Sequence, residues 1–148
     1  MPGPDIPRSS PWSVYMMLSA DGANITWTNQ PSGETFFGNS HRHVQPISLW
    51  GLTYGRLIMN KQGTAANTGA TVELRYSTTY QTVAGNYVQL GVTPIIVSID
   101  VTNQVVDSGW IELNNDAKGD EDVFLALVGV GGNGTIDPQF GSVSARFQ

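Results

Sequence analysis

Apolar and polar residues alternate along this chain in short runs that predict β-strands. The clearest run lies near the C-terminus, where Val143, Ala145 and Phe147 alternate with polar neighbours, as in a strand with one buried face. Before it, every position from 123 to 130 is apolar or glycine, which predicts a strand covered on both faces. A glycine-rich turn joins the two runs. We therefore expect an antiparallel hairpin in this part of the chain.

Comparable runs recur through the rest of the sequence. Turn signals built on Gly, Asn and Pro separate them about every 8 to 12 residues, a spacing typical of antiparallel sandwiches and barrels. The expected strands cover residues 14–18, 23–27, 34–37, 47–52, 54–60, 70–77, 87–90, 95–102, 104–106 and 110–113. No heptads, parallel βαβ alternation or internal repeats are evident. The predicted fold class is all-β, an antiparallel, jelly-roll-like β-sandwich.

The N-terminal segment has a different character. Prolines at positions 2, 4, 7 and 11 preclude a helix and favour an extended arm over residues 1–11, followed by a single domain over residues 12–148. The arm is interpreted either as a strap laid over a neighbouring subunit or as a loose terminus. It lacks the continuous apolar core of a signal peptide, so we expect synthesis without a secretory leader. No apolar run approaches the roughly 18 residues of a membrane span.

Composition excludes several classes of function. A length of 148 residues suffices for one domain that folds without metals or disulfides. Cysteine is absent, which excludes disulfide scaffolds, thiolate metal sites and thiol nucleophiles. The net charge is −5 and the lysines are Lys61 and Lys118 alone, so no basic patch is expected and nucleic acid is not an expected partner.

The doubly apolar run at 123–130 also bears on assembly. In a monomeric sandwich each strand shows one face to water and should alternate, so the excess apolar residues predict a subunit interface formed by Val123, Leu125 and Leu127. A central strand covered by long loops is the alternative. Trp110, which alternates with Ile111, is expected on the less buried face as an interface anchor. We expect a homo-oligomer, with a trimer favoured.

The two histidines, His41 and His43, are the candidate metal ligands. Residues two apart in an extended segment point to the same side, so both imidazoles could reach one ion. Because no third histidine or nearby acid completes the set, an intrachain site is incomplete, whereas a site shared by three chains on a threefold axis stays open. An exposed polar loop explains the pair without a metal. Ser40 lacks the setting of a catalytic nucleophile, so we expect no enzyme activity and no cofactor.

Aromatic residues offer a second kind of site. Trp27 stands between Thr26 and Thr28, a polar setting in which an exposed ring would stack on a sugar. The alternative is that this ring packs in the core, as most tryptophans of β-sandwiches do.

The segment from Trp110 to Phe147, WIELNNDAKGDEDVFLALVGVGGNGTIDPQFGSVSARF, has a recognisable order of features. A Trp-containing strand, an acidic loop, an apolar strand, a glycine-rich turn, a D-P-x-F-G motif and a final strand follow one another. In this order it resembles the C-terminal half of small β-sandwich proteins on the heads or fibres of tailed bacteriophages. The proline-rich arm, the absent cysteine and the few lysines are similar to such proteins too.

The resemblance implies a non-enzymatic virion structural protein, a capsid decoration, cement or head-fibre subunit. Its implied partners are further copies of itself and the major capsid or other virion proteins, with no nucleic acid or membrane. Its implied location is the capsid surface, after synthesis in the host cytoplasm. The resemblance carries over no catalytic residue. A carbohydrate- or receptor-binding β-sandwich that uses Trp27 is the alternative function.

Overall fold

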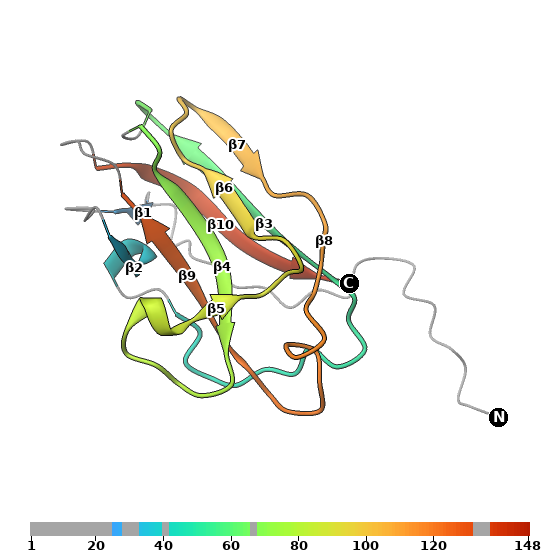
Figure 1. Ribbon diagram of the computed structural model, residues 1–148. Helices are drawn as coiled ribbons and strands as arrows, with labels where there is room; N and C mark the ends of the chain where they lie inside the picture. The colour runs from blue at the N-terminus through green and yellow to red at the C-terminus, as the bar shows by residue number, and fades with distance from the viewer. Residues whose placement is uncertain (1–24, 28–32, 40–41, 66–67, 132–136) are drawn as a thin grey trace.

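The structure is a computed structural model that describes residues 25–27, 33–39, 42–65, 68–131 and 137–148. In this part of the chain the regular elements are strands and two short 3-10 turns, so the expected all-β class is confirmed (Figure 1). Nowhere in these ranges is there a helix with the length and apolar character needed to cross a bilayer. The elements are β1 (Ile25–Thr26), β2 (Glu34–Phe36), η1 (Phe37–Asn39), β3 (Tyr54–Gln62), β4 (Thr71–Ser77), η2 (Ala84–Asn86), β5 (Val88–Gln89), β6 (Ile95–Ser98), β7 (Gln104–Asp107), β8 (Ile111–Glu112), β9 (Phe124–Val130) and β10 (Gln139–Phe147).

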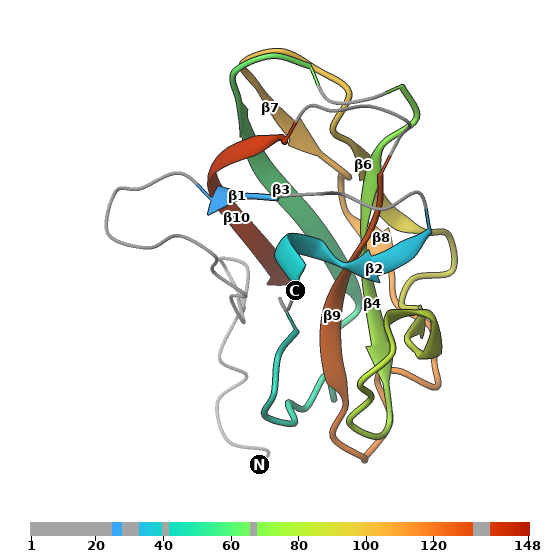
Figure 2. The same ribbon diagram turned by 90° about the vertical axis from the view of Figure 1, so that its left-hand side faces the viewer.

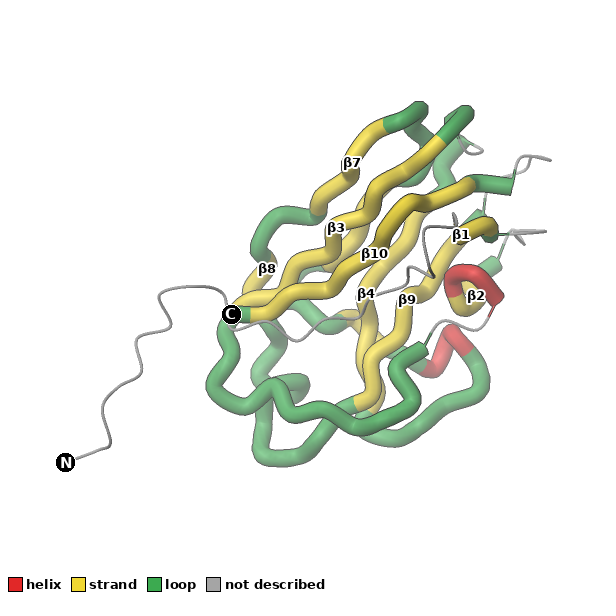
Figure 3. Tube along the Cα trace, turned by 180° about the vertical axis from the view of Figure 1, so that it is seen from behind, coloured by secondary structure: helices red, strands yellow, loops and turns green. Residues whose placement is uncertain are grey.

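The strands form two antiparallel sheets that pack face to face. Sheet I has the order β1-β10-β3-β7, with β8 also paired to β3, and sheet II has the order β2-β9-β4-β5, with β6 also paired to β4. Figure 2 shows the two layers, with β10 and β3 on one side and β9 and β4 on the other. From behind, sheet I lies in front of sheet II (Figure 3). The expected antiparallel sandwich is confirmed.

The strand order is that of a jelly roll. β5 and β6 pair with successive parts of β4, and β7 and β8 with successive parts of β3, so each of these two pairs fills a single strand position. The described residues thus contain eight strand positions, in which the first pairs with the last, the second with the seventh, the third with the sixth and the fourth with the fifth. This nested set is one long hairpin rolled into two sheets, the architecture of a jelly roll.

The main core lies between the sheets and follows the predicted alternation. On β10, Val143, Ala145 and Phe147 are fully buried, as expected from the sequence. Their cross-strand neighbours on β3 include Met59 and Leu57, which point into the same layer. Sheet II supplies its own inward row from β4 and β9.

A second apolar layer covers the outer face of sheet II. Ala126 and Val128 of β9 point away from the main core, yet both are buried. Phe36, Ala84 and Tyr87 cover them and form with them what we call the outer cluster. Ala84 and Tyr87 come from the loop between β4 and β5, which folds over β9 and β2 in Figure 1. This loop explains why β9 is apolar on both faces within one chain.

The segment at 47–52 differs from its expected strand, and the expected N-terminal elements lie outside the described residues. Residues 47–52, expected as a strand, form a turn with a single bridge between Ile47 and Val123, because the buried Leu49 and Leu52 stand three apart and flank Gly51 at a φ of 76°. That spacing and that φ fit a turn, not a strand. The expected arm over 1–11, the expected strand at 14–18 and the start of the domain at residue 12 lie outside the described residues.

Candidate functional site

The residues expected to form a subunit interface lie in the core. Val123, Leu125 and Leu127 are at most 1% exposed and belong to the cluster between the two sheets. The interface prediction for these three residues is therefore wrong, and covering by a long loop, the alternative, accounts for the apolar strand. The reason is physical: sheet I covers these three side chains, and the β4–β5 loop, together with Phe36, covers the opposite, equally apolar face of β9.

Trp110, the expected anchor, is half-buried and carries an arginine on its ring. The guanidinium carbon of Arg56 lies 5.4 Å from the ring centroid, within cation–π range. Arg56 Nε donates to Asp107 Oδ1 at 2.8 Å, and Nη2 donates to the other carboxylate oxygen, which makes a bidentate pair. Hydrogen bonds from Arg56 hold the pKa of Asp107 below its ordinary value. A role for Trp110 in an interface stays a prediction.

The edge strands, by contrast, expose apolar side chains. We call Val88, Val92, Ile96 and Val105 the flank residues, because they lie on β5, β6 and β7 or between them, at the edges of the two sheets. They are 38% to 58% exposed. Neither β6 nor β7 contains Lys, Arg or Pro, the residues that usually protect an edge strand from pairing with another chain.

Part of this side of the sandwich is closed by the chain itself. Gly91 and Leu113 form an isolated bridge, and Val92 N donates to Glu112 O at 2.8 Å. The ladders found in the described residues pair β6 with β4 alone and β7 with β3 alone. The open stretch is therefore formed by β6 and β7.

Trp27, the expected sugar platform, is fully buried. Its ring makes an edge-to-face contact with Phe37 at a centroid distance of 5.6 Å. An ideal Cβ at Gly129 would lie 2.5 Å from the nearest ring atom of Trp27, so glycine in β9 makes room for the indole. A ring without exposed surface has no face to offer a pyranose, and the prediction of glycan contact at Trp27 is wrong.

The histidine pair can be followed at one position. His41 lies outside the described residues, and His43 Nδ1 lies 2.6 Å from Gln45 O, a contact in which the ring nitrogen donates to the carbonyl. Among the described residues, no three His, Asp or Glu side chains gather in a way that would hold a metal ion. The shared site on a threefold axis stays a prediction.

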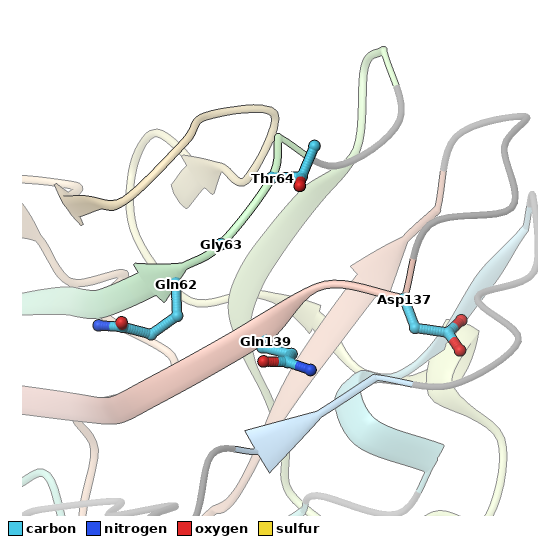
Figure 4. Close-up of a pocket in the computed structure, with 5 residues that line it drawn as sticks. All are labelled: Gln62, Gly63, Thr64, Asp137 and Gln139. Carbon is cyan, nitrogen blue, oxygen red and sulfur yellow. The ribbon is translucent and has the colours of Figure 1, made fainter.

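A polar hollow of about 210 Å³ lies where β3 ends and β10 begins. It is lined by Gln62, Gly63, Thr64, Asp137 and Gln139 (Figure 4). In this view the Gln62 amide and the Asp137 carboxylate point in opposite directions, so these groups do not converge on one point. Geometry of this kind does not assemble a nucleophile and a base, which must meet in space.

Lys61 lies next to this hollow and is fully buried. Its Nζ donates to Gln62 O at 2.6 Å and to Thr64 O at 2.5 Å. Burial lowers the pKa of Lys61 below its ordinary value. Because the amine is inaccessible and holds two backbone carbonyls, its role in this structure is to fix the turn after β3.

An ion network crosses the outer face of sheet II. Arg75 donates to Glu73 Oε1 at 3.0 Å and to Glu34 Oε1 at 2.9 Å. The hydrogen bond from Arg75 lowers the pKa of Glu34. Glu73 is only 7% exposed, so Arg75 compensates a nearly buried carboxylate beside the outer cluster.

A feature that sequence reasoning missed lies at the turn formed by residues 49–52. Trp50 is 66% exposed, and with Ser48 and Asp120 it lines an open hollow of about 350 Å³. A second hollow of about 370 Å³ is lined by Gly51, Thr53, Tyr54 and Gln148. The available signal was the sequence Leu49-Trp50-Gly51-Leu52, in which two apolar residues bracket a Trp-Gly turn.

Comparisons of the chain with protein-family models, with curated proteins and with solved structures found no match.

Proposed function

We propose that the chain is a non-enzymatic virion structural protein, a capsid decoration, cement or head-fibre subunit that acts through self-association and contacts with capsid proteins. The observation that carries this proposal is the open stretch of β6 and β7 with its exposed flank residues. Two further observations support it. The segment from Trp110 resembles phage head and fibre proteins, and the jelly roll is an architecture that viral capsid domains share with lectins and cupins. Fold alone does not fix function, so assembly is the property to test.

The flank residues favour association for two reasons. Ile96 and Val105 lie on short edge strands, and within the described residues the ladders of these strands run on one side only, which leaves the other side to pair with a strand of another chain. Burial of one such exposed side chain contributes about 1 to 2 kcal/mol. Three copies joined through these edges would form a closed ring, which fits the favoured trimer.

The test is the mass of the full chain in solution, measured by light scattering over a wide range of concentrations. We expect the wild type to have a multiple of the subunit mass, and Val105→Asp to be a folded monomer with an unchanged circular dichroism spectrum. Val83→Asp is the matched control, because Val83 is 57% exposed against 58% for Val105 but lies in the β4–β5 loop. This control should keep the wild-type mass.

Binding to capsid shells gives the second readout. Wild type and Val83→Asp should co-sediment with shells of the source particle, and Val105→Asp should do so much more weakly. A wild-type chain that stays monomeric at every concentration and does not bind such shells would contradict the proposal.

A further inference from the structure

The turn at residues 49–52 holds its tryptophan in a fixed, outward position. Leu52 N donates to Leu49 O at 3.0 Å, and both leucine side chains are buried. Gly51 occupies the third position of this turn at a φ of 76°, a conformation that glycine adopts without steric cost. The two leucines anchor the turn in the core, so Trp50 at its second position has nowhere to go but outward.

Hydrogen bonds tie the chain on both sides of the turn. Before it, Ile47 and Val123 exchange two backbone hydrogen bonds, of 2.9 and 2.8 Å. After it, the amides of Thr53 and Tyr54 both donate to Gln148 O, at 2.6 and 2.8 Å. Hydrogen bonds therefore hold the backbone that carries the exposed ring in place, and a ligand that binds the ring loses little free energy to ordering of the loop.

The ring of Trp50 has no use in the described fold. Within the described residues this ring takes part in no aromatic stacking or cation–π contact, and Trp50 is 66% exposed. The carboxylate of Asp120, on the same hollow, forms no ion pair or hydrogen bond with any described residue. A rigid exposed indole beside an unused carboxylate and the Ser48 hydroxyl is a set of groups that suits a ligand.

The chemistry of the two hollows points to a sugar. The negative π face of an indole attracts the C–H face of a pyranose, and carboxylate and hydroxyl oxygens accept hydrogen bonds from its hydroxyl groups. The second hollow is lined by Gly51, which follows Trp50 in the chain, and adds the Tyr54 ring, the Thr53 hydroxyl and the Gln148 amide. Residues of one turn line both hollows, and each hollow has an aromatic residue in its described lining, an arrangement that matches successive units of an oligosaccharide.

The charge around the hollows restricts the class of sugar further. Asp120 is followed by Glu121 and Asp122, which are exposed as well, and the chain carries a net charge of −5. A carboxylated or sulfated sugar would be repelled by this acidic segment, whereas a neutral sugar would not. A quaternary ammonium ligand is typically held in a cage of several aromatic rings, whereas in the described residues Trp50 is the aromatic residue that lines the first hollow.

We propose that the two hollows beside the turn at residues 49–52 bind a neutral oligosaccharide, with Trp50 stacked on one sugar ring, Asp120 and Ser48 holding its hydroxyl groups, and Tyr54 contacting the next unit. This site goes beyond the proposed virion function and does not depend on it. The flank residues and the turn belong to different elements, so each can be altered without the other.

The experiment screens the full chain on an array of neutral and acidic glycans and then titrates the best neutral tri- or tetrasaccharide while recording indole N–H signals by NMR. Trp50→Phe identifies the Trp50 signal by its loss. We expect that signal to shift on titration, with Trp50→Ala weakening binding by at least about tenfold. Asp120→Asn should weaken it about threefold or more.

Matched variants separate this proposal from the assembly proposal. Trp50→Ala should lose sugar binding and keep the wild-type mass, whereas Val105→Asp should lose the wild-type mass and keep its affinity for sugar per subunit. The proposal would be overturned if neither the array nor the titration detected binding of a neutral sugar at concentrations up to millimolar. Unchanged sugar binding by Trp50→Ala would overturn it as well. Loss of capsid-shell binding by Trp50→Ala with no sugar bound would mean that this ring contacts a protein instead, and would overturn it as well.

Discussion

Replacement of Gly129 by Ala tests the packing of the buried tryptophan. The added Cβ would lie 2.5 and 2.9 Å from two ring carbons of Trp27, whereas non-bonded carbons pack best at about 3.5 to 4.0 Å. The ring would therefore have to retreat by about 1 Å. The indole also contacts the ring of Phe37 at a centroid distance of 5.6 Å, and Phe37 packs against Phe140 at 4.9 Å, so the densely packed core leaves the indole little free space.

The expected loss of stability follows from two opposing effects. Overpacking of a dense core costs about 1 to 3 kcal/mol. A Gly→Ala change also removes freedom from the unfolded chain, which returns about 0.4 to 1 kcal/mol. The midpoints of the two ranges give a net loss of about 1.3 kcal/mol in the free energy of unfolding, or roughly 3 to 5 °C in Tm for a domain of this size.

Urea and thermal unfolding followed by circular dichroism measure this loss. Gly119→Ala is the control, because the atom nearest to its added Cβ is a backbone oxygen at 4.0 Å, and its change should stay within about 0.5 kcal/mol. Trp27→Phe shortens the ring, so Gly129→Ala should cost less in that background, with a coupling of about 0.5 kcal/mol or more. Wild-type stability of Gly129→Ala, or additive effects in the double variant, would refute the reasoning.

Two further changes test the charged groups. Arg75→Met should lower the free energy of unfolding by about 2 to 4 kcal/mol, because it leaves the nearly buried Glu73 unpaired. Glu34→Gln should lower it by less than about 1 kcal/mol, because the Glu34 side chain is 43% exposed. Equal losses for the two variants in urea titrations would contradict this expectation. Since burial lowers the pKa of Lys61 below its ordinary 10.5, the unfolded state binds more protons between the two pKa values. Wild-type stability should therefore rise relative to Lys61→Met as pH increases through that window toward 10.5, and parallel pH profiles of the two proteins would count against it.

Strands with one solvent-exposed face could be predicted, because the alternation of apolar and polar residues that marks them is a local feature of the sequence. The alternation of Val143, Ala145 and Phe147 predicted β10 and its buried face, and both are observed. The run at 123–130 predicted the strand at β9, but its cover could not be foreseen. Ala84 and Tyr87, which are distant from β9 in the sequence, cover this strand. The hydrophobic pattern of the sequence does not indicate which distant segment packs on a given strand.

The site at residues 48–54 escaped prediction for a local reason. Ile47, Leu49 and Leu52 look like part of an apolar strand, and only the positive φ of Gly51 reveals a turn that turns Trp50 outward. The polar neighbours Thr26 and Thr28 predict an exposed ring at Trp27, yet Gly129 on a distant strand provides the space in which this ring is buried. Exposure of a single large ring depends on such long-range partners, which sequence spacing does not encode.

The nested pairing of strands sets the order in which this chain folds. The innermost pair, β4 with β5 and β6, is local, whereas the outermost pair joins Ile25 to Phe140. Closing a long loop has an entropic cost that precedes its contacts, so we expect the inner hairpin to form early and folding to take about milliseconds to seconds, as in other all-β domains. β10 lies between β1 and β3, and is the last of these strands to be synthesised. Before β10 is available, β1 and β3 lack their common partner and expose unpaired strand edges. We therefore expect chaperones to bind the chain most readily just before synthesis of residues 139–147 is complete.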